Sequence, residues 1–311
     1  MRRIRGRSRK RIIKKSYAWF LIIATIVVIV ALFLMKYIST KGHVNTSTYI
    51  AQSNENTASN IVEDNTPKDI GASIAIVGNI NPDNNILSDS YVSENNSYNF
   101  LHIFENIERY LKYVDITIGT LDLNISNNNS LRDLFTSLGE CGFDIISTAT
   151  EYTLKSNSDS IANTISELNN NEILSIGTYK NKNESNDVLI KSVEGFKIAF
   201  LSYCSNFSNT NNNYYINKID KDFIEEQIDI SKNKGADVIC VNLHWGNLYS
   251  SSPSEEQKEL VDFLFKNGVD IILGSHPNTV QPLEVRDITL ENGKTKKRYY
   301  NIFFRRFFKL K

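Results

Sequence analysis

The sequence predicts an α/β domain with two sheets flanked by helices, preceded by one transmembrane helix. From about residue 72 onward, short apolar runs rich in β-branched residues alternate with segments whose apolar residues recur at helical spacing. Each apolar run is too uniform for a sheet with one face in water, so we expect strands that are buried on both faces. The transmembrane helix is predicted from an uncharged apolar run of 18 residues, Ala18 to Met35, which is long enough to cross a bilayer.

The segment before this run predicts the orientation of the anchor. Residues 2–15 contain nine Lys and Arg and no acidic residue, a composition that would suggest nucleic-acid binding if the segment stood alone. Directly before an apolar span, it indicates a cytoplasmic flank instead. The span is not followed by a clear small-x-small cleavage site. We therefore expect a basic cytoplasmic segment at 1–16 and an uncleaved, single-pass anchor at 17–37, with the domain outside the cell.

The next segment and the charge balance restrict the partners of the exported part. Residues 38–71 are rich in Asn, Ser, Thr and Lys and hold few large apolar residues, so we expect a disordered stalk. Without the nine basic residues of the first segment, the chain has 26 Lys and Arg against 35 Asp and Glu. The exported part should therefore not attract nucleic acid or another polyanion unaided. Its cysteines, Cys141, Cys204 and Cys240, lie in or beside apolar runs and are expected to be buried free thiols.

The first half of the domain alternates strands with helices. A strand at Ser73 to Val77 ends in a turn at Gly78-Asn79, and Asp115 to Leu121 is the next strand. Between them, Phe100 to Tyr113 carries apolar residues at helical spacing and predicts one helix. The further expected elements are a helix at 131–141, a strand at 143–148, a hairpin across 188–203 and a helix at 227–233.

The most informative stretch is a β-α-β unit between residues 238 and 284. A buried strand runs from Val238 to Leu243 and stops at His244, and a second buried strand, Asp270 to Leu273, ends at Gly274-Ser275-His276-Pro277. The helix between them begins at Ser254. Two parallel strands thus deliver a histidine each to the same edge of a sheet, where open α/β sheets place their ligands.

The two histidines have two interpretations. A single histidine at a strand end is most often a hydrogen-bonded structural residue. Two neutral imidazoles that converge from adjacent strand ends are what a divalent metal site requires. We expect the ring nitrogens of His244 and His276 to lie roughly 4 to 5 Å apart at one sheet edge.

Sequence motifs in this unit resemble a known family. LHWGNLY, followed by a helix and GVDIILGSHPNTVQPLEV, resembles the CapA-type poly-γ-glutamate capsule biosynthesis proteins, a branch related to the calcineurin-like metallophosphoesterases. DITIGTLD, GFDIISTATEYTLKS and GFKIAFLSYC extend the resemblance to roughly residues 72–290. It implies a metallophosphoesterase-like four-layer sandwich, two sheets between helices, for residues 72–293.

The resemblance also implies which residues would form a site. The motif positions that still carry ligands for a metal are His244, His276 and Asp122, and the supporting positions that match are Trp245, Gly246 and Glu284. The substituted positions are Asn79 for Asp, Thr120 for Asn, Thr150 and Tyr152 for the Asn and His of the NNH motif, and Asn278 for the third His. Amide oxygens and a phenol are weak ligands for zinc, manganese or magnesium. We therefore expect no two-metal site, at most one weakly bound Mn, Zn or Fe ion, and assign no catalytic residue.

This ligand count leaves more than one function open. The favoured one is a membrane-anchored extracellular protein of capsule (poly-γ-glutamate) or cell-envelope polymer synthesis or export, without chemistry of its own. Its expected partners are the membrane, other capsule-synthesis membrane proteins and an anionic polymer, with no nucleic acid. The alternatives are a metal-dependent phosphoesterase-like hydrolase and a non-functional truncated copy. Metal content after purification would distinguish the first two.

The C-terminal tail at 294–311, KTKKRYYNIFFRRFFKLK, follows no clean helical or strand period. The resembled family continues here with a strand and the motif Y-S-L-G-N-F. In one choice of codons, reading Arg298 to Phe308 one base later gives Asp-Ile-Ile-Ile-Tyr-Ser-Leu-Gly-Asp-Phe-Phe, so we interpret the tail as a frameshift product, which sequencing of the gene would test. The alternative is a basic amphipathic tail that touches the membrane. The frameshift predicts that the final strand is missing and that the sheet ends on an unpaired edge.

Overall fold

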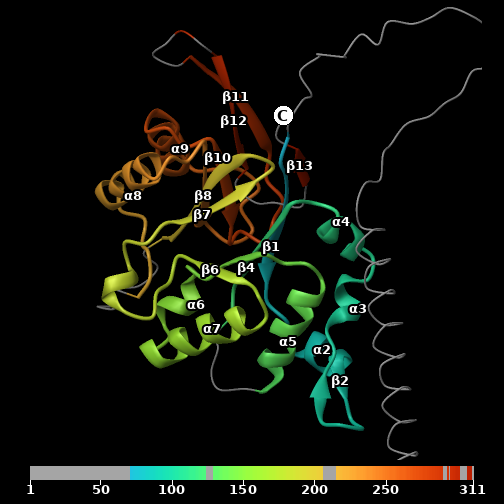
Figure 1. Ribbon diagram of the computed structural model, residues 1–311. Helices are drawn as coiled ribbons and strands as arrows, with labels where there is room; N and C mark the ends of the chain where they lie inside the picture. The colour runs from blue at the N-terminus through green and yellow to red at the C-terminus, as the bar shows by residue number, and fades with distance from the viewer. Residues whose placement is uncertain are drawn as a thin grey trace, which may run out of the picture. The chain divides into compact units, whose positions relative to one another are not determined.

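Two sheets form the framework of the domain (Figure 1). The computed structural model describes residues 71–123, 129–205, 215–289, 293, 295–301 and 307–309. The chain divides into two compact units, Met1–Asn65 and Thr66–Lys311, and the described residues belong to the second. The predicted basic segment, anchor and stalk lie outside the described residues. Among the helices that are described, none is long and apolar enough to cross a membrane.

The first sheet has five strands in the order β13-β1-β4-β5-β6. They are β1 (Ser73–Ile80), β4 (Ile116–Leu121), β5 (Ile145–Ser147), β6 (Leu174–Ile176) and β13 (Phe307–Lys309). The four strands from β1 to β6 in this order are parallel, as expected for strands that alternate with helices. Strand β13 pairs antiparallel with the start of β1.

The second sheet has six strands in the order β11-β12-β10-β9-β8-β7. They are β7 (Leu189–Val193), β8 (Phe196–Cys204), β9 (Val238–His244), β10 (Ile271–Ser275), β11 (Leu283–Thr289) and β12 (Thr295–Asn301). Strands β8, β9, β10 and β12 are parallel, and the hairpins β7–β8 and β11–β12 add an antiparallel strand at each edge. The predicted hairpin across 188–203 is therefore confirmed.

The helices lie between the strands in sequence, and α5, α7, α8 and α9 cover the outer faces of the sheets. They are α2 (Asn84–Ser90), α3 (Leu101–Phe104), α4 (Glu108–Lys112), α5 (Asn129–Glu140), α6 (Glu151–Leu154), α7 (Ser158–Asn170), α8 (Lys221–Asn233), α9 (Glu255–Lys266) and the short 3-10 helix η1 (Lys182–Glu184). A small hairpin, β2 (Tyr91–Val92) with β3 (Ser97–Tyr98), follows α2. Helix α9 begins as predicted, because the side chains and backbone amides of Ser254 and Gln257 form a reciprocal capping box.

Among the described residues, three large apolar cores separate four layers, and a smaller apolar cluster surrounds Cys204. One core lies between the sheets and joins Ile74 and Ile118 of the first to Phe200 and Leu273 of the second. Another covers the outer face of the five-stranded sheet with α5 and α7, and the third covers the outer face of the six-stranded sheet with α8 and α9. The predicted α/β class, with two sheets flanked by helices, is confirmed. So is the prediction of free, buried cysteines.

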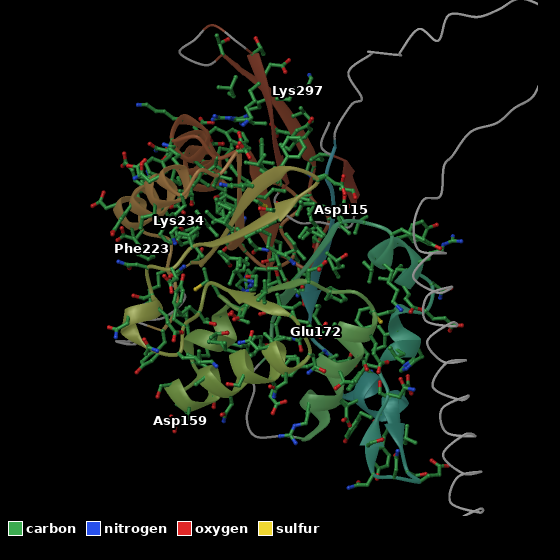
Figure 2. The ribbon with its side chains drawn as sticks, viewed as in Figure 1. Asp115, Asp159, Glu172, Phe223, Lys234 and Lys297 are labelled. Carbon is green, nitrogen blue, oxygen red and sulfur yellow. The ribbon has the colours of Figure 1, made fainter. Side chains whose placement is uncertain are left out.

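The C-terminal tail differs from our expectation. We predicted that the final strand is missing, but residues 295–301 form β12, which lies between β11 and β10 and pairs with β11 along its whole length. Its side chains alternate, because Arg298 and Tyr300 are buried while the Lys297 side chain is 63% exposed (Figure 2). The expectation was wrong because the period of a short polar strand becomes recognisable only beside its partner strands.

Strand β13 extends the five-stranded sheet beyond β1. It pairs with Ser73–Ala75 in the register Ser73↔Lys309, Ile74↔Phe308 and Ala75↔Phe307. Next to this edge, Asp115 ties the start of β4 to β1, since its carboxylate accepts from the Ser73 amide at 2.7 Å (Figure 2). The five-stranded sheet therefore has a paired edge at the start of β1.

Candidate functional site

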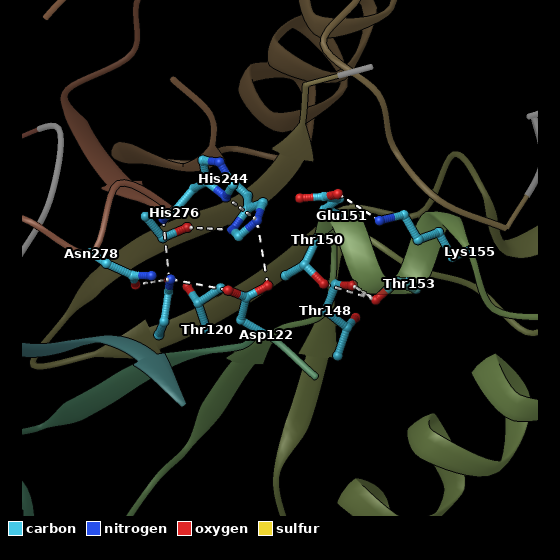
Figure 3. A network of polar contacts seen from close by, with 12 residues as sticks. Thr120, Asp122, Thr148, Thr150, Glu151, Thr153, Lys155, His244, His276 and Asn278 are labelled. Atoms are coloured by element: carbon cyan, nitrogen blue, oxygen red, sulfur yellow. Dashed lines mark hydrogen bonds and ion pairs between the residues drawn. The ribbon is translucent and has the colours of Figure 1, made fainter. Parts of the chain in front are cut away.

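Four strand ends from the two sheets meet in one polar site (Figure 3). Asn79 lies near the end of β1, Asp122 directly follows β4, His244 ends β9, and His276 directly follows β10. The pairing of Ser275 with His244 in the parallel ladder brings the two histidine-bearing ends level. The convergence predicted from the β-α-β unit is therefore present, and it includes the other sheet as well.

The two histidines are in direct contact. His276 Nδ1 lies 3.2 Å from His244 Nε2, closer than the expected 4 to 5 Å, and the ring planes are inclined at 68°. His244 Nδ1 lies 3.2 Å from Ser275 Oγ, which itself donates to the Leu243 carbonyl at 3.4 Å. The hydroxyl therefore accepts from Nδ1–H of His244, and Nε2 of this ring accepts from Nδ1–H of His276. In this assignment both rings are neutral.

Asp122 faces the same ring nitrogen from the other sheet. Its Oδ1 lies 3.5 Å from His244 Nε2 and is a buried oxygen without a hydrogen-bond partner. Burial, and next the charge of Glu151, raises the pKa of Asp122 from 3.8 to about 7. Burial, and next the proximity of His276, lowers the pKa of His244 to about 3. Each of these two shifts favours the uncharged form of its group.

Asn79 joins these residues with all the polar atoms of its side chain. Its Nδ2 donates to Asp122 Oδ2 at 3.1 Å and to Asn278 Oδ1 at 3.0 Å, and its Oδ1 accepts from the His276 backbone amide at 3.2 Å. The hydrogen bond from the His276 amide fastens a turn whose backbone is strained. His276 and Asn278 in this turn have φ values of 96° and 56°, in the left-handed region. The substituted Asn79 thus bridges the two sheets.

The other substituted positions lie around this centre without joining it. Thr120 is buried, and its Oγ1 accepts from Asn242 Nδ2 at 3.2 Å. Thr150 is buried before α6 and its hydroxyl contacts that of Thr153 at 3.1 Å. Tyr152 is 39% exposed, with the Lys155 ammonium 5.8 Å from its ring centre. The structure therefore places the phenol of Tyr152 at the surface.

The three supporting positions have structural contacts. Trp245 is buried, and Gly246 has φ 83° and lies so close to Gln257 that an added Cβ would be 2.7 Å from its Nε2. Glu284 is on the exposed strand β11, where its carboxylate lies 3.8 Å from the Arg286 guanidinium. Trp245 and Gly246 shape the turn after His244, whereas the described ion pair of Glu284 is on the β11–β12 ribbon.

Sequence reasoning missed two side chains of the site. Glu151 lies beside Thr150, and its carboxylate contacts the Lys155 ammonium at 2.6 Å (Figure 3). Burial lowers the pKa of His276, and the charge of Glu151 partly offsets this lowering. Burial raises the pKa of Asp122, and the charge of Glu151 adds to this shift. Ser275 orients the His244 ring, as described above. The sequence signal for Glu151 was a carboxylate between the motif positions Thr150 and Tyr152, shortly after the predicted strand at 143–148.

The residues present do not fit the metal centre that the resemblance implies. The separations of 3.2 Å and 3.5 Å around His244 Nε2 are similar to those between ligands that share an ion at about 2.0 to 2.2 Å. However, Asn79 directs an amide N–H₂ group at Asp122 and Asn278, where the family has a carboxylate. Within the described ranges, no group of three or more His, Cys, Asp or Glu side chains is arranged to hold a metal ion.

The fold and the site define an α/β protein of two stacked sheets with a polar, histidine-containing centre at their common strand ends. Residues 73–298 match the family described as bacterial capsule synthesis protein PGA_cap. The match covers more than half of the chain, and the chain belongs to this family.

Two curated relatives agree with this assignment. The capsule biosynthesis protein CapA of Bacillus anthracis is 24% identical over 212 residues, which is 61% of this chain and 51% of that protein. The PGA biosynthesis protein CapA of Bacillus subtilis (strain 168) is 25% identical over 158 residues, which is 49% of this chain and 41% of that protein. The chain spans about half the length of the curated relatives it matches.

A solved structure with partial likeness is the sulfate thiohydrolase SoxB of Termus thermophilus in complex with glycerol. It is 11% identical, covers 60% of this chain and 39% of its own, and has a TM-score of 0.35.

Proposed function

We propose that this protein acts in the synthesis or export of a capsule polymer, poly-γ-glutamate or another cell-envelope polymer, as a membrane-anchored extracellular member of its family. In this proposal the domain is a metallophosphoesterase-like shell that binds or assembles partners and carries out no chemistry. The family assignment and the capsule-synthesis names of the relatives support the process. The apolar run 18–35 behind a basic segment supports the anchor.

The observation that carries the non-catalytic role is the position of Asn79. Metal-assisted hydrolysis requires anionic ligands that hold an ion, which then lowers the pKa of a bound water. Here the amide of Asn79 donates to Asp122 Oδ2 and Asn278 Oδ1, so both oxygens are already engaged by a neutral group. A cation in this place would have to displace these hydrogen bonds and face the N–H₂ group of Asn79, which is electrostatically unfavourable.

Metal binding tests this proposal directly. The variant Asn79→Asp/Tyr152→His/Asn278→His places one carboxylate and one imidazole at the converging turns and a second imidazole at position 152 outside the centre, so its affinity for Mn²⁺ or Zn²⁺ should exceed that of the wild type. Calorimetric titration of the full-length chain in detergent measures both. The matched control, Asn85→Asp/Tyr91→His/Asn95→His, introduces the same side chains at exposed positions and should bind as the wild type does. Equal affinity of the restored variant and the wild type would contradict the assignment of these positions.

A metal-dependent phosphoesterase-like hydrolase is the second candidate. It is favoured by the buried Asp122 Oδ1, which has no hydrogen-bond partner and lies beside the two histidines. Stoichiometric manganese, zinc or iron in the protein as purified would support this candidate. It would also overturn the non-catalytic role.

The anchor predicts a topology that protease treatment can test. Because nine Lys and Arg precede the apolar run, the N-terminus should remain in the cytoplasm and the domain should lie outside. Protease added to intact cells, with the wall opened, should remove the domain, while an N-terminal epitope should persist until the cells are lysed. A domain that is protected until lysis would reverse the orientation.

A further inference from the structure

Strand β11 forms an exposed edge of the six-stranded sheet. It is the last strand in the sheet order, and its seven residues pair with β12 from Leu283↔Asn301 to Thr289↔Thr295. The β11–β12 ribbon extends outward from the rest of this sheet (Figure 1). Among the described strands, none pairs with the side of β11 that faces away from β12. The backbone groups on that side therefore form a template for a further strand.

This edge lacks the features that normally protect a sheet edge. Natural edge strands are short, carry Lys or Pro, or contain a bulge that interrupts pairing. The opposite edge of the same sheet, β7, carries Lys191 at its centre, and the edge strand β6 of the other sheet has only three residues. By contrast, β11 has the sequence LEVRDIT, without Lys or Pro, and its register with β12 is continuous. A strand of this kind is typical of edges that pair with another chain.

One face of β11 is apolar and largely uncovered. Leu283 and Val285 point to the same face, because side chains alternate along a strand. The register leads from Val285 through Tyr299 to Ile271, which lies in the core between the two sheets. Yet Leu283 is 42% exposed and Val285 is 49% exposed. The core between the sheets therefore covers these two side chains only in part, and a partner strand can cover them further.

The charges of β11 have a self-complementary order. Glu284 and Arg286 flank Val285 and share the other face of the strand, where their own carboxylate and guanidinium lie 3.8 Å apart. If two β11 strands pair antiparallel about an axis at Val285, Glu284 of each copy lies opposite Arg286 of the other, an arrangement that stabilises a strand pair. An axis at Glu284 or at Arg286 would instead place two like charges opposite each other. The charge order therefore favours an axis at Val285.

We infer that β11 is the interface of a homodimer, in which the β11 strands of two copies pair antiparallel about a two-fold axis at Val285. The two six-stranded sheets then form one continuous sheet, and Leu283 and Val285 of both copies lie together on one face. A single strand pair buries less than the about 1,600 Å² of a standard interface, so the association should be reversible and concentration-dependent. Neither the proposed anchor nor the proposed function is required for this pairing.

Disulfide cross-linking of the full-length chain in detergent tests this register. Val285→Cys places two thiols at directly opposed positions, where the Cα atoms lie about 4.5 to 5.5 Å apart, within the range of a disulfide. Asp287→Cys is the matched control on the same face of the strand, because in this register position 287 lies opposite Leu283 and about 13 Å along the strand from its own copy. The native cysteines are buried.

Mild oxidation should link the Val285→Cys chain into a dimer and leave the Asp287→Cys chain monomeric. A mixture of Leu283→Cys and Asp287→Cys chains should form a mixed disulfide dimer, since these positions are opposed. Absence of the Val285→Cys dimer, or equal linking of the Val285→Cys and Asp287→Cys chains, would overturn the proposed pairing.

Sedimentation equilibrium of the chain without introduced cysteines measures the association itself. Val285→Lys should weaken it about tenfold or more, because lysine opposes pairing at a sheet edge and two lysines would meet at the axis. The melting temperature should not change, since half of the Val285 side chain is exposed. Leu174→Lys makes the same kind of change at an exposed position of the edge strand β6 and should associate as the wild type does.

The remaining outcomes identify other occupants of this edge. A wild-type chain that stays monomeric at every concentration, or a dimer that is equally strong with Val285→Lys, would overturn the interface at β11. Protection of the Val285→Cys thiol from alkylation only after poly-γ-glutamate is added would assign the edge to an anionic polymer. That result would likewise overturn the second copy as the occupant.

Discussion

Replacing Asp122 by Asn should raise the free energy of unfolding at pH 8 by about 4 kcal/mol when a chelator is present. The carboxylate is 6% exposed and its pKa in the folded protein is raised from 3.8 to about 7, first by burial and then by the charge of Glu151. At pH 8 the folded protein must therefore hold a buried negative charge. Asn removes this charge and keeps an oxygen that can accept from Asn79 Nδ2.

The pH dependence has a definite sign. A folded state that binds the Asp122 proton more tightly than the unfolded state does is favoured at low pH. This contribution is fully present below pH 3.8 and is lost as the pH rises through about 7. The lowered pKa of His244 acts in the opposite direction. Its contribution to stability is present above pH 6.5 and is lost as the pH falls through about 3. The wild type and the Asp122→Asn variant share this contribution, so it does not affect the difference between them. The variant should therefore gain on the wild type between pH 4 and pH 7.

Denaturant unfolding at several pH values, with chelator present, measures this difference. Asp89→Asn is the control, since Asp89 is exposed on α2 and its replacement should change stability by only about 0.5 kcal/mol. Equal stability of the wild type and the Asp122 variant at pH 8 would show that the carboxylate is compensated. If Mn²⁺ or Zn²⁺ stabilised only the wild type, the compensating group would be a cation, which would favour the hydrolase.

Replacing Tyr300 by Ala should lower the free energy of unfolding by about 3 to 5 kcal/mol. The side chain is 2% exposed and its ring centre lies 6.0 Å from that of Phe265. The Arg286 guanidinium lies 4.9 Å above the same ring. Truncation would leave a cavity between β12 and α9 in the core of the six-stranded sheet.

Two further variants separate the causes of this loss. Tyr300→Phe keeps the ring and removes the hydroxyl, which accepts from Arg286 Nη2 at 3.4 Å, so it should cost about 1 kcal/mol or less. Lys297→Ala changes an exposed neighbour on the same strand and should be nearly neutral. A neutral Tyr300→Ala would show that the tail does not occupy the sheet position described for β12.

The sequence by itself determined the α/β class, the β-α-β unit around His244 and His276, and the meeting of these residues at one sheet edge. These features depend on local patterns, because buried parallel strands are continuous apolar runs and a capping residue such as Ser254 is visible in its own neighbourhood. The family resemblance further indicated Asp122 as their neighbour. That neighbour comes from the other sheet, which periodicity alone does not align with the first.

Only the tertiary structure decided how these groups are used. The bridge made by Asn79, the buried oxygen of Asp122 and the contribution of Glu151 depend on distances between turns that lie far apart in the chain. The same holds for β12, whose alternation has meaning only between β10 and β11. It also holds for Ile103 and Tyr110, whose apolar pattern predicted burial although the folded chain leaves 39% and 44% of them exposed. Local sequence specifies which face is apolar, whereas the packing of the whole chain decides which apolar faces are buried.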